Sequence, residues 1–407
     1  MKINKQDIIK KEDFLWEIPQ TFRPQMRVPA RVIASETLLD AIMEDRSLVQ
    51  LVNVASLPGM GKGGQINLNP KEMDEVLTKG AEWAVDNGYA DKKDLTYMES
   101  NGRLDNADPA LVSEMAKKRG SDQLGTIGSG NHFVEVDYVE EIYDPIAAEA
   151  YGLSKGQVVV LIHTGSRGLG HQVATDYIRG IMAAMPNYGI KVPDRELACV
   201  PFNSEEGENY FKAMCAAANF AWCNREIISW EVRKAWKNVF GADVAPLKLM
   251  YDVAHNIAKI ETHKVDGEKL KVLVHRKGAT RAFGPGFEDL PKEYLSIGQP
   301  VIIPGSMGTC SYILAGTNRS EEISFGSCCH GAGRKLSRTA AKKQVNAPVL
   351  KEKLREMGIY VQAGSFKGIA EEAPIAYKDV NEVVETIQDS GIAKKVAKLR
   401  PMAVVKG

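Results

Sequence analysis

Apolar residues recur at helical spacing in the first quarter of the chain. Residues 36–55, ETLLDAIMEDRSLVQLVNVA, carry them at intervals of three and four, which predicts a helix. Residues 69–88, NPKEMDEVLTKGAEWAVDNG, begin with the start signals Asn69 and Pro70 and end at Gly88, which predicts a second helix. A glycine-rich joint, SLPGMGKGGQINL, separates the two segments. The first part of the chain is therefore expected to be mainly helical.

The middle of the chain contains short apolar runs that are typical of buried strands. These runs are HFVEVDYV (132–139), QVVVLIH (157–163), LKLMYDVAH (247–255), LKVLVHRK (270–277), QPVIIPG (299–305) and CSYILAG (310–316). A long helix is predicted from about residue 208 to residue 240, and further helices in RKLSRTAAKKQV, VLKEKLREMG and KDVNEVVETIQDSG. This order indicates a mixed α+β fold with central β-sheets flanked by helices. The spacing is too irregular for a (β/α)8 barrel or a doubly wound sheet.

Composition and charge exclude several classes of protein. The 407 residues are 44% hydrophobic and 26% charged, as in ordinary globular proteins. Since 52 basic residues balance 52 acidic ones, a surface that is basic everywhere is excluded, although a local basic groove is not. No apolar run is long enough for a membrane span, and the charged start lacks a signal-peptide core. The six cysteines have no CxxC spacing, which predicts reduced thiols and a cytoplasmic location.

Four of the seven histidines fall at predicted strand ends or in glycine turns. They are His132 in GSGNHFVEV, His163 in HTGSRGLGH, His255 in YDVAHNIAK and His330 in CCHGAGR. Side chains at such positions can converge on one pocket, and three neutral imidazoles can bind an ion such as Mn, Zn or Fe. A single histidine in this context is more often a hydrogen-bonded core residue, and His263 and His275 are interpreted in that way.

Glycine-rich loops provide a second signal. They are GTIGSGN (125–131), HTGSRGLGH (163–171), PGSMGTCS (304–311) and HGAGR (330–334), and none has the lysine pattern of a P-loop. Such loops also serve simply to reverse strands, but their backbone N–H groups can bind phosphate. Because each lies beside a candidate metal ligand or nucleophile, together they indicate phosphate chemistry. The basic run RKLSRTAAKK (334–343) is either a solvated helix face or a surface for phosphates.

The adjacent residues Cys328, Cys329 and His330 allow a metal site, a thiol nucleophile or a histidine nucleophile. Neighbouring side chains alternate in direction along an extended chain, so the three do not easily face one ion. A neutral imidazole is a competent nucleophile near its ordinary pKa of about 6.5. We therefore interpret His330 as the reactive group and the thiols as packing residues.

Together these stretches resemble the RtcB family, the GTP-dependent tRNA-splicing RNA ligases. The matching segments are WEIP, MRVPARV, GSGNHFVEV, HTGSRGLGHQVATDY, YDVAHNIAK, VHRKGATRAF, IPGSMGTCSYILAGT, CCHGAGRKLSR, EEAPIAYKDV and RPMAVVKG. The resemblance implies a single catalytic domain over residues 1–407. It also implies an enzyme that uses GTP and two Mn²⁺ ions to join RNA 3′-phosphate or 2′,3′-cyclic phosphate ends to 5′-hydroxyl ends, as in tRNA splicing and RNA repair. The implied partners are RNA, as tRNA halves or broken ends, and an archease-type activator.

The resemblance also implies a role for individual residues. His330 would be guanylylated, GMP would pass to the RNA 3′-phosphate, and the 5′-hydroxyl would displace it. The implied metal ligands are His132, His163 and His255. Nucleotide contacts are implied for Asn131, Glu135, Asn256, Pro304, Gly305, Ser306, Met307, Ser311, Gly331, Ala332, Gly333 and Lys406. A straight strand would place Glu135 and His132 on opposite faces, so a bend is expected there, and Lys406 requires the C-terminus to fold back into the site.

The chain departs from the family pattern in one place. The family has a long segment with a DxxCG motif, whose Asp and Cys bind the metals, whereas LPGMGKGGQINL runs directly into the next matching block. The comparison therefore predicts an internal deletion near residues 60–61. One ion would keep only His132 and the other His163 and His255, although Mn²⁺ prefers carboxylate and water. Loss of core strands also predicts unpaired strand edges and an open, exposed cleft around these histidines.

Three hypotheses follow from the sequence. The first is an RtcB-type RNA ligase. The second is a catalytically impaired paralogue that binds guanosine nucleotide or RNA ends without ligating them, and the third is a metal-dependent phosphoesterase that uses the three histidines. His330, its glycine turn and Lys406 favour guanylylation over hydrolysis. The lost Asp and Cys favour the second hypothesis over the first.

Overall fold

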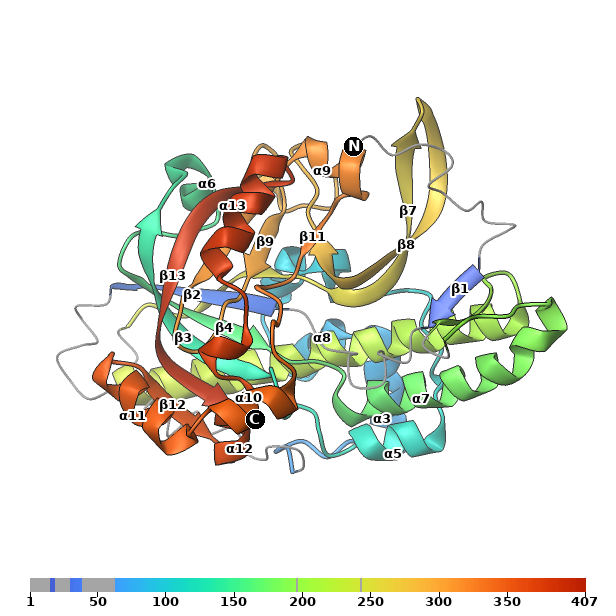
Figure 1. Ribbon diagram of the computed structural model, residues 1–407, viewed down its shortest axis with the longest axis horizontal. Helices are drawn as coiled ribbons and strands as arrows, with labels where there is room; N and C mark the ends of the chain where they lie inside the picture. Colours follow the sequence, from blue (N-terminus) through green and yellow to red (C-terminus); the bar gives the residue numbers. More distant parts are fainter. Residues whose placement is uncertain (1–14, 19–29, 39–62, 195–196, 242–243) are drawn as a thin grey trace.

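An eight-stranded sheet lies at the centre of the molecule (Figure 1). The computed structural model describes residues 15–18, 30–38, 63–194, 197–241 and 244–407. The strand order is β6–β2–β4–β3–β13–β10–β9, and β12 pairs with β13 in parallel, whereas the other pairs are antiparallel. The bounds are Ala30–Leu38 (β2), Phe133–Ile142 (β3), Gln157–His163 (β4), Lys248–Asp252 (β6), Pro300–Ile303 (β9), Ser311–Gly316 (β10), Tyr360–Ala363 (β12) and Ala393–Lys406 (β13).

A smaller sheet, in the order β11–β8–β7, lies beside the central one. Its strands are Ser327–Cys329 (β11), Glu268–Arg281 (β8) and His255–Val265 (β7). Asp266 and Gly267 join β7 to β8 in a two-residue turn and have φ values of 49° and 88°, as an Asp-Gly hairpin turn requires. This hairpin projects from the body at the upper right of Figure 1. A separate pair of short strands, Leu15–Ile18 (β1) and Ala198–Pro201 (β5), completes the sheets of the described residues.

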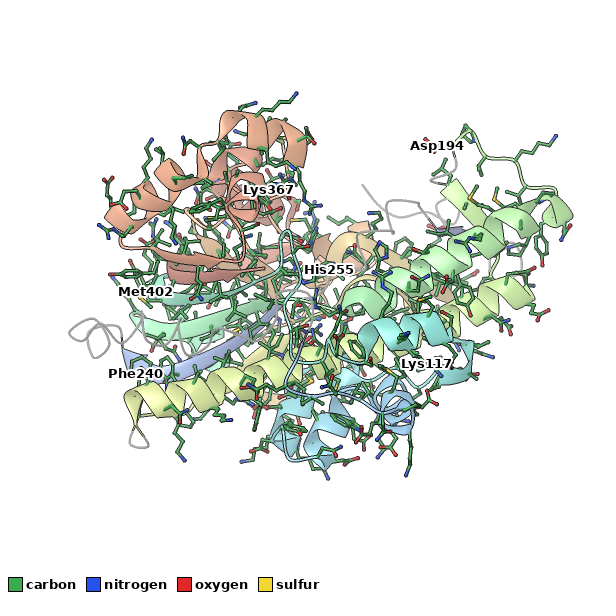
Figure 2. All side chains as sticks on the ribbon, turned by 90° about the horizontal axis from the view of Figure 1, so that it is seen from below. Lys117, Asp194, Phe240, His255, Lys367 and Met402 are labelled. Atoms are coloured by element: carbon green, nitrogen blue, oxygen red, sulfur yellow. The ribbon has the colours of Figure 1, made fainter. Side chains whose placement is uncertain are left out.

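Helices cover both faces of the central sheet. The longest, α8 (Glu205–Phe240), lies along one face, and the C-terminal helices lie on the opposite side (Figure 2). Ser204 caps α8 at its start, where three glutamates in the first turn favour the positive end of the helix dipole. The other helices are Pro70–Lys79 (α3), Ala81–Asp86 (α4), Glu114–Gly120 (α5), Pro145–Ala150 (α6), Arg167–Ala184 (α7), Asn318–Ser324 (α9), Arg338–Gln344 (α10), Ala347–Glu356 (α11), Phe366–Glu371 (α12) and Val380–Ser390 (α13). Within the described ranges, no helix has the length and apolar character of a membrane span.

The predicted α+β fold with central sheets and flanking helices is confirmed. Each of the six predicted runs contains a strand: 157–163 has the predicted ends, the run 247–255 covers β6 and reaches the first residue of β7, and the ends of the others shift by a few residues. The helix predicted over 69–88 begins at its Asn69 cap but is broken by Gly80 into α3 and α4. The helix predicted over 36–55 is wrong at its start, because residues 36–38 end β2, where Leu38 pairs with Gln157. Residues 39–55 and the first part of the glycine-rich joint, residues 56–62, lie outside the described residues.

A buried charge network joins α8 to the central sheet. Arg31 of β2 donates to Asp252 at 2.7 Å and to Glu226 of α8 at 2.5 Å. Arg225, also on α8, donates two hydrogen bonds of 2.7 Å to the same Asp252. All four side chains are fully buried, so each charge depends on its partners for compensation. The network therefore fixes α8 against β2 and β6.

Replacing Asp252 with alanine is expected to destabilise the protein strongly, because Arg31 and Arg225 would then share one buried carboxylate. The expected loss is about 3 to 5 kcal/mol in the free energy of unfolding, measured by urea denaturation. Glu36→Ala, which removes an exposed pair with Lys248, provides the control and is expected to leave the unfolding midpoint unchanged. Equal midpoints for the two variants would contradict this account of the network.

Candidate active site

Turns that are distant in sequence meet at one end of the central sheet. His163 ends β4 and is paired in register with Phe133, the first residue of β3, so His132 lies in the turn just before that strand. Residues His255 of β7 and Cys328 of β11 both pair with Thr280 of β8. The start of β7 and the end of β11 therefore flank the same strand, which brings His255 next to the residue that follows β11, His330.

Three of the four candidate histidines form one cluster. The Nε2 atoms of His163 and His255 are 3.3 Å apart, and the ring centres of His255 and His330 are 4.4 Å apart. One ring nitrogen from each of the three lies within 4.8 Å of the others, a spacing that can hold a metal ion. His132 is not in this group. Its Nδ1 lies 3.1 Å from the Gly128 amide and 2.9 Å from the Thr164 hydroxyl.

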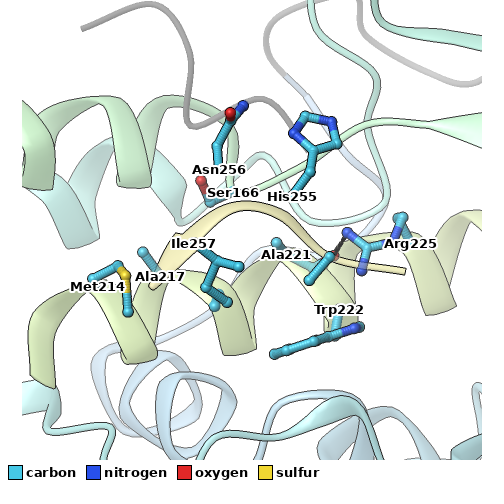
Figure 3. A pocket seen from close by; sticks show the side chains of 11 residues that line it. Ser166, Met214, Ala217, Ala221, Trp222, Arg225, His255, Asn256 and Ile257 are labelled. Atoms are coloured by element: carbon cyan, nitrogen blue, oxygen red, sulfur yellow. Dashed lines mark hydrogen bonds between the residues drawn. The ribbon is translucent and has the colours of Figure 1, made fainter. Parts of the chain in front are cut away.

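The expected open cleft around the predicted metal histidines is wrong. His132, His163 and His255 are all buried, with at most 9% of each side chain exposed. The sheet remains continuous beneath them, because β2 pairs with both β4 and β6. Helix α8 covers the same end from below, where Ala217, Ala221 and Trp222 lie under His255 (Figure 3). Only a cavity of about 30 Å³ remains between α8 and the start of β7, which is room for a single water molecule.

A larger cavity of about 290 Å³ lies beside His163 and His330. Pockets that bind small ligands begin at about this size. Eleven of the twelve residues for which the resemblance implies nucleotide contacts line it: Asn131, Glu135, Asn256, Pro304, Gly305, Ser306, Met307, Gly331, Ala332, Gly333 and Lys406. Ser311 is not in the lining, but its hydroxyl accepts a hydrogen bond of 3.2 Å from the Gly305 amide. The fold thus brings the expected nucleotide-contact residues together around one cavity.

The last strand forms one wall of this cavity. Lys406 of β13 pairs with Phe133, so the chain folds back into the site as expected. Its ammonium lies 5.5 Å above the Phe133 ring and 4.0 Å from Glu372. Glu135 faces the cavity on the same side of β3 as Phe133, because residues two apart in a strand share a face. His132 precedes the strand and does not line this cavity, whereas Asn131, Phe133 and Glu135 do, so the side chains alternate as in a straight strand and the expected bend is not observed.

Burial shifts the pKa values of the ionisable groups in this wall. It raises the pKa of Glu135 to about 7, against the attraction of Lys406. The neighbouring carboxyl of Asp137 is fully buried, and burial together with Glu135 raises its pKa as well. Burial lowers the pKa of Lys406, which Glu372 and Glu135 oppose. The cavity therefore contains a carboxyl group that titrates near neutral pH.

Sequence reasoning did not identify the acidic side of the cavity. Arg334, Glu372 and Tyr377 also line it, and Glu372 accepts hydrogen bonds from Tyr377 and, at 3.4 Å, from Arg338. The Arg334–Glu372 distance is 3.1 Å. The basic run 334–343 is thus partly neutralised by this carboxylate and by Glu371, which pairs with a lysine of α10. Residues 371–372 lie in the EEAPIAYKDV stretch, but no local pattern shows that it returns to the basic helix.

Two residues near the histidines adopt left-handed backbone conformations. Asn256, directly after His255, has φ of 56°, and its side-chain oxygen accepts from the Gly278 amide at 2.8 Å. Arg167, at the start of α7, has φ of 53° and donates to the Thr126 hydroxyl at 3.0 Å. Non-glycine residues in this region carry strain that the surrounding structure must hold, and such strain is concentrated at functional sites.

Asn224 of α8 ties two of the histidine-bearing loops together. Its side-chain oxygen accepts from the amides of Gly125 and Thr126, at 2.7 and 3.1 Å, in the loop before His132. Its amide group donates to the carbonyls of Thr126 and Gly165, at 3.1 and 2.9 Å, the second of which follows His163. Both hydrogen-bond donors and both acceptor positions of this buried side-chain amide are therefore used.

Arg225 extends the connection to the third loop. It donates to the Thr164 carbonyl at 3.3 Å and to Asp252, three residues before His255. Asn224 and Arg225 are adjacent on α8, so one turn of this helix contacts the segments that carry His132, His163 and His255.

The fold and the site define a class: a mixed α+β protein in which a histidine cluster adjoins a glycine-lined cavity of about 290 Å³, an arrangement suited to a phosphoryl- or nucleotidyl-transfer enzyme. Comparison with known proteins then identifies the family. The family model described as "tRNA-splicing ligase RtcB" matches residues 26–407, and the chain belongs to the RtcB family.

Individual relatives share extensive identity with the chain. It is 46% identical to tRNA-splicing ligase RtcB of Thermococcus kodakarensis over an alignment of 469 residues, which covers 96% of this chain and 97% of the relative. For the Archaeoglobus fulgidus protein the identity is 43% over 483 residues, covering all of both chains. The Pyrococcus abyssi protein is 56% identical over 351 residues, which are 86% of this chain and 38% of that relative. Because the A. fulgidus alignment, at 483 residues, is longer than this 407-residue chain, that relative contains residues without a counterpart here.

Asn224→Asp is expected to weaken divalent-ion binding at the histidine cluster. A carboxylate still accepts from Gly125 and Thr126 but cannot donate to the carbonyls of Thr126 and Gly165. The loops should therefore shift, and the Co²⁺ dissociation constant measured by calorimetry should rise about tenfold, as for other residues that orient ligands.

Asn219→Asp is the matched control. Asn219 is also buried on α8, accepts from the Leu104 amide and donates to the carbonyls of Leu77, Thr78 and Leu104. It contacts none of the histidine loops, so its substitution should lower stability while leaving Co²⁺ affinity unchanged. If both variants lose affinity to the same extent, Asn224 acts through general stability and not through the loops.

Proposed function

We propose that this protein is an RNA ligase that joins RNA 3′-phosphate or 2′,3′-cyclic phosphate ends to 5′-hydroxyl ends through a histidine–GMP intermediate. The observation that carries the proposal is the position of His330 in a cavity lined by eleven of the twelve expected nucleotide-contact residues. Membership of a family whose members are described as tRNA-splicing ligases supports the reaction class. The substrates would be the ends of tRNA halves or of broken RNA, and an archease-type activator is the proposed protein partner.

The proposed chemistry begins at His330. Its imidazole attacks the α-phosphorus of GTP, an N–P bond forms, and pyrophosphate leaves. A 3′-phosphate oxygen of RNA then attacks the same phosphorus, so the histidine is released and GMP is attached to the RNA end. Finally the 5′-hydroxyl attacks the RNA phosphorus, loses its proton and displaces GMP. A 2′,3′-cyclic end would first be opened by water to give the 3′-phosphate.

The chain contributes binding and charge compensation to these steps. Lys406 and Arg334 line the cavity and offset phosphate charge, and the glycine turn 331–333 presents backbone N–H groups next to His330. Glu135, when ionised, is placed to accept hydrogen bonds from the N–H groups of a guanine base. Asn256, held in its strained conformation, lies between the histidine cluster and the cavity.

The family resemblance assigns two Mn²⁺ ions to His132, His163 and His255, and the donors present fit only part of this scheme. A bound ion would neutralise charge on the transferring phosphate. His163 fits a ligand role, because its Nδ1 lies 3.1 Å from the Asn131 carbonyl and its Nε2 faces the Nε2 of His255. Of the histidines that the resemblance assigns, a second ion would have only His132, and a single neutral imidazole does not fit an Mn²⁺ ion.

The length of the A. fulgidus alignment favours one alternative function. We propose that the absent residues are the segment with the family's Asp-x-x-Cys ligands, lost near residues 60–61 of a single catalytic domain. A chain without these ligands would still have the nucleotide cavity. The alternative is therefore a catalytically impaired paralogue that binds guanosine nucleotide or RNA ends without ligating them.

Incubation with α-labelled GTP and Mn²⁺ tests the proposed intermediate. The parent protein is expected to become labelled, whereas His330→Ala should remain unlabelled because it lacks the attacking nitrogen. His275→Ala, in which a histidine outside the cluster is removed, should label like the parent. An unlabelled parent that still binds GTP in a filter assay would exclude the ligase mechanism and favour the impaired paralogue.

The pH dependence of GTP binding tests the role of Glu135. Since burial raises its pKa to about 7, the carboxyl is ionised above this pH and protonated below it. Only the ionised form accepts from both N–H groups of guanine, so affinity should fall by about tenfold between pH 8 and pH 6. The Glu135→Gln variant should bind more weakly and without this slope, as fluorescence titration would show. A slope that persists in this variant would assign the titration to another group.

A further inference from the structure

We propose that one face of the β7–β8 hairpin binds the phosphate backbone of the RNA whose end reaches His330. The proposal rests on the proposed function, because it adds a docking surface for the RNA substrate of the same site. The hairpin projects from the body at the upper right of Figure 1. Eight side chains make up this lysine face: Ile260, Thr262 and Lys264 on β7, and Lys269, Lys271, Leu273, His275 and Lys277 on β8.

The side chains of the lysine face point to the same side because the two strands pair in register. Lys264 is opposite Lys269, and the further pairs follow at intervals of two residues, so they share one face of the ribbon. All eight are exposed except Leu273, which is half-buried. The alternate positions of both strands, apart from Glu268 at the turn, are buried or half-buried from residue 259 to residue 276. The hairpin therefore has one face toward the protein and one toward solvent.

The acidic residue within β7 is used on the opposite face. Glu261 pairs with Arg276 at 2.7 Å and lies 3.1 Å from the imidazole of His263. On the lysine face, three side chains make no ion pair within the part of the chain that the structure describes: Lys264, Lys269 and Lys271. Positive charge is thus concentrated on the exposed face, as a polyanionic ligand requires.

Lysines on exposed strands can also serve only to prevent the strands from pairing with other chains. That role needs charge, but it does not need a single sign of charge. Like charges directly opposite each other on antiparallel strands are destabilising, and Lys264 and Lys269 form such a pair. The single sign therefore lowers the stability of the free hairpin, and a bound phosphate backbone would offset this repulsion.

The lysine face leads directly to the nucleotide cavity. Lys277 precedes Gly278, which lines the cavity, and the His330 amide donates to the Gly278 carbonyl at 3.3 Å. From Lys277 back to Lys269 the strand covers about 27 Å, at about 3.4 Å per residue. One strand of a nucleic-acid duplex advances by about 3.4 Å per nucleotide, so this length corresponds to about eight nucleotides. RNA whose end lies beside His330 can thus place its phosphates along the lysine face.

RNA binding by a triple variant of the full-length protein tests the proposal. The variant carries Lys264→Gln, Lys269→Gln and Lys271→Gln, which remove three charges and leave the cavity lining unchanged. The probe is a 5′-labelled RNA of about 20 nucleotides with a 3′-phosphate, long enough to cover the face, and fluorescence anisotropy without GTP gives its affinity. Each lost phosphate contact lowers the slope of log K against log salt by about 0.7, so the slope should fall by about 2 and the affinity at about 0.1 M salt by about 100-fold.

A second triple variant with Lys92→Gln, Lys155→Gln and Lys237→Gln is the matched control, because it has the same change in net charge. These lysines are exposed, and Lys155 lies just before β4, at the end of that strand opposite to His163. The control should bind the RNA within about twofold of the parent, since charges more than about 10 Å from the ligand are largely screened. Thermal unfolding verifies that both variants are folded.

Equal RNA affinity and salt slope in the parent and the hairpin variant would overturn the proposal. Equal losses in the two triple variants would also overturn it, because net charge and not the lysine face would then determine binding. So would a parent that binds no RNA. These results are separate from the test of the proposed function, because labelling of His330 with GMP requires no RNA.

Discussion

The site depends on one buried turn of α8, where Asn224 and Arg225 contact the loops of three histidines. Arg225 shares Asp252 with Arg31 of β2, so the same turn is fixed to the sheet by charges that have no contact with water. A buried ion pair of this kind contributes little net stability compared with apolar packing, but loss of one partner is costly. Its contribution here is positional, because the histidine segments come from strands that are far apart in the sequence.

Much of the fold was predictable because the apolar runs are long and strongly patterned. The strand QVVVLIH is buried along its whole length and was predicted with its observed ends. Residues 36–38 were misassigned because the apolar spacing of the stretch that they begin fits a helix, whereas they are held by pairing with β4, a long-range contact that local pattern does not contain. Strand β13 was not predicted as a strand, since its lysines and arginines alternate irregularly with apolar residues along a bulged register.

The sequence predicted most of the residues that belong to the site, but not the hydrogen bonds between them. Glycine turns next to histidines, together with the family resemblance, identified most of the residues that line the cavity. The hydrogen bond between Gly128 and His132 depends on a backbone conformation that residue types do not specify. The same holds for Glu372, whose role emerges only when Arg334, Arg338 and Tyr377 converge on it.

The place of β13 in the sheet has a consequence for how the protein is made. This strand lies between β3 and β10, and its Arg400 contacts Glu140, which precedes it by 260 residues. Strand pairings over such separations are slow to form, because the long loop between the strands must first be closed. During synthesis the histidine loops would leave the ribosome before Lys406. The wall of the cavity that β13 forms therefore stays open until this strand is inserted. A nascent chain would therefore contain His330 before the cavity beside it is complete.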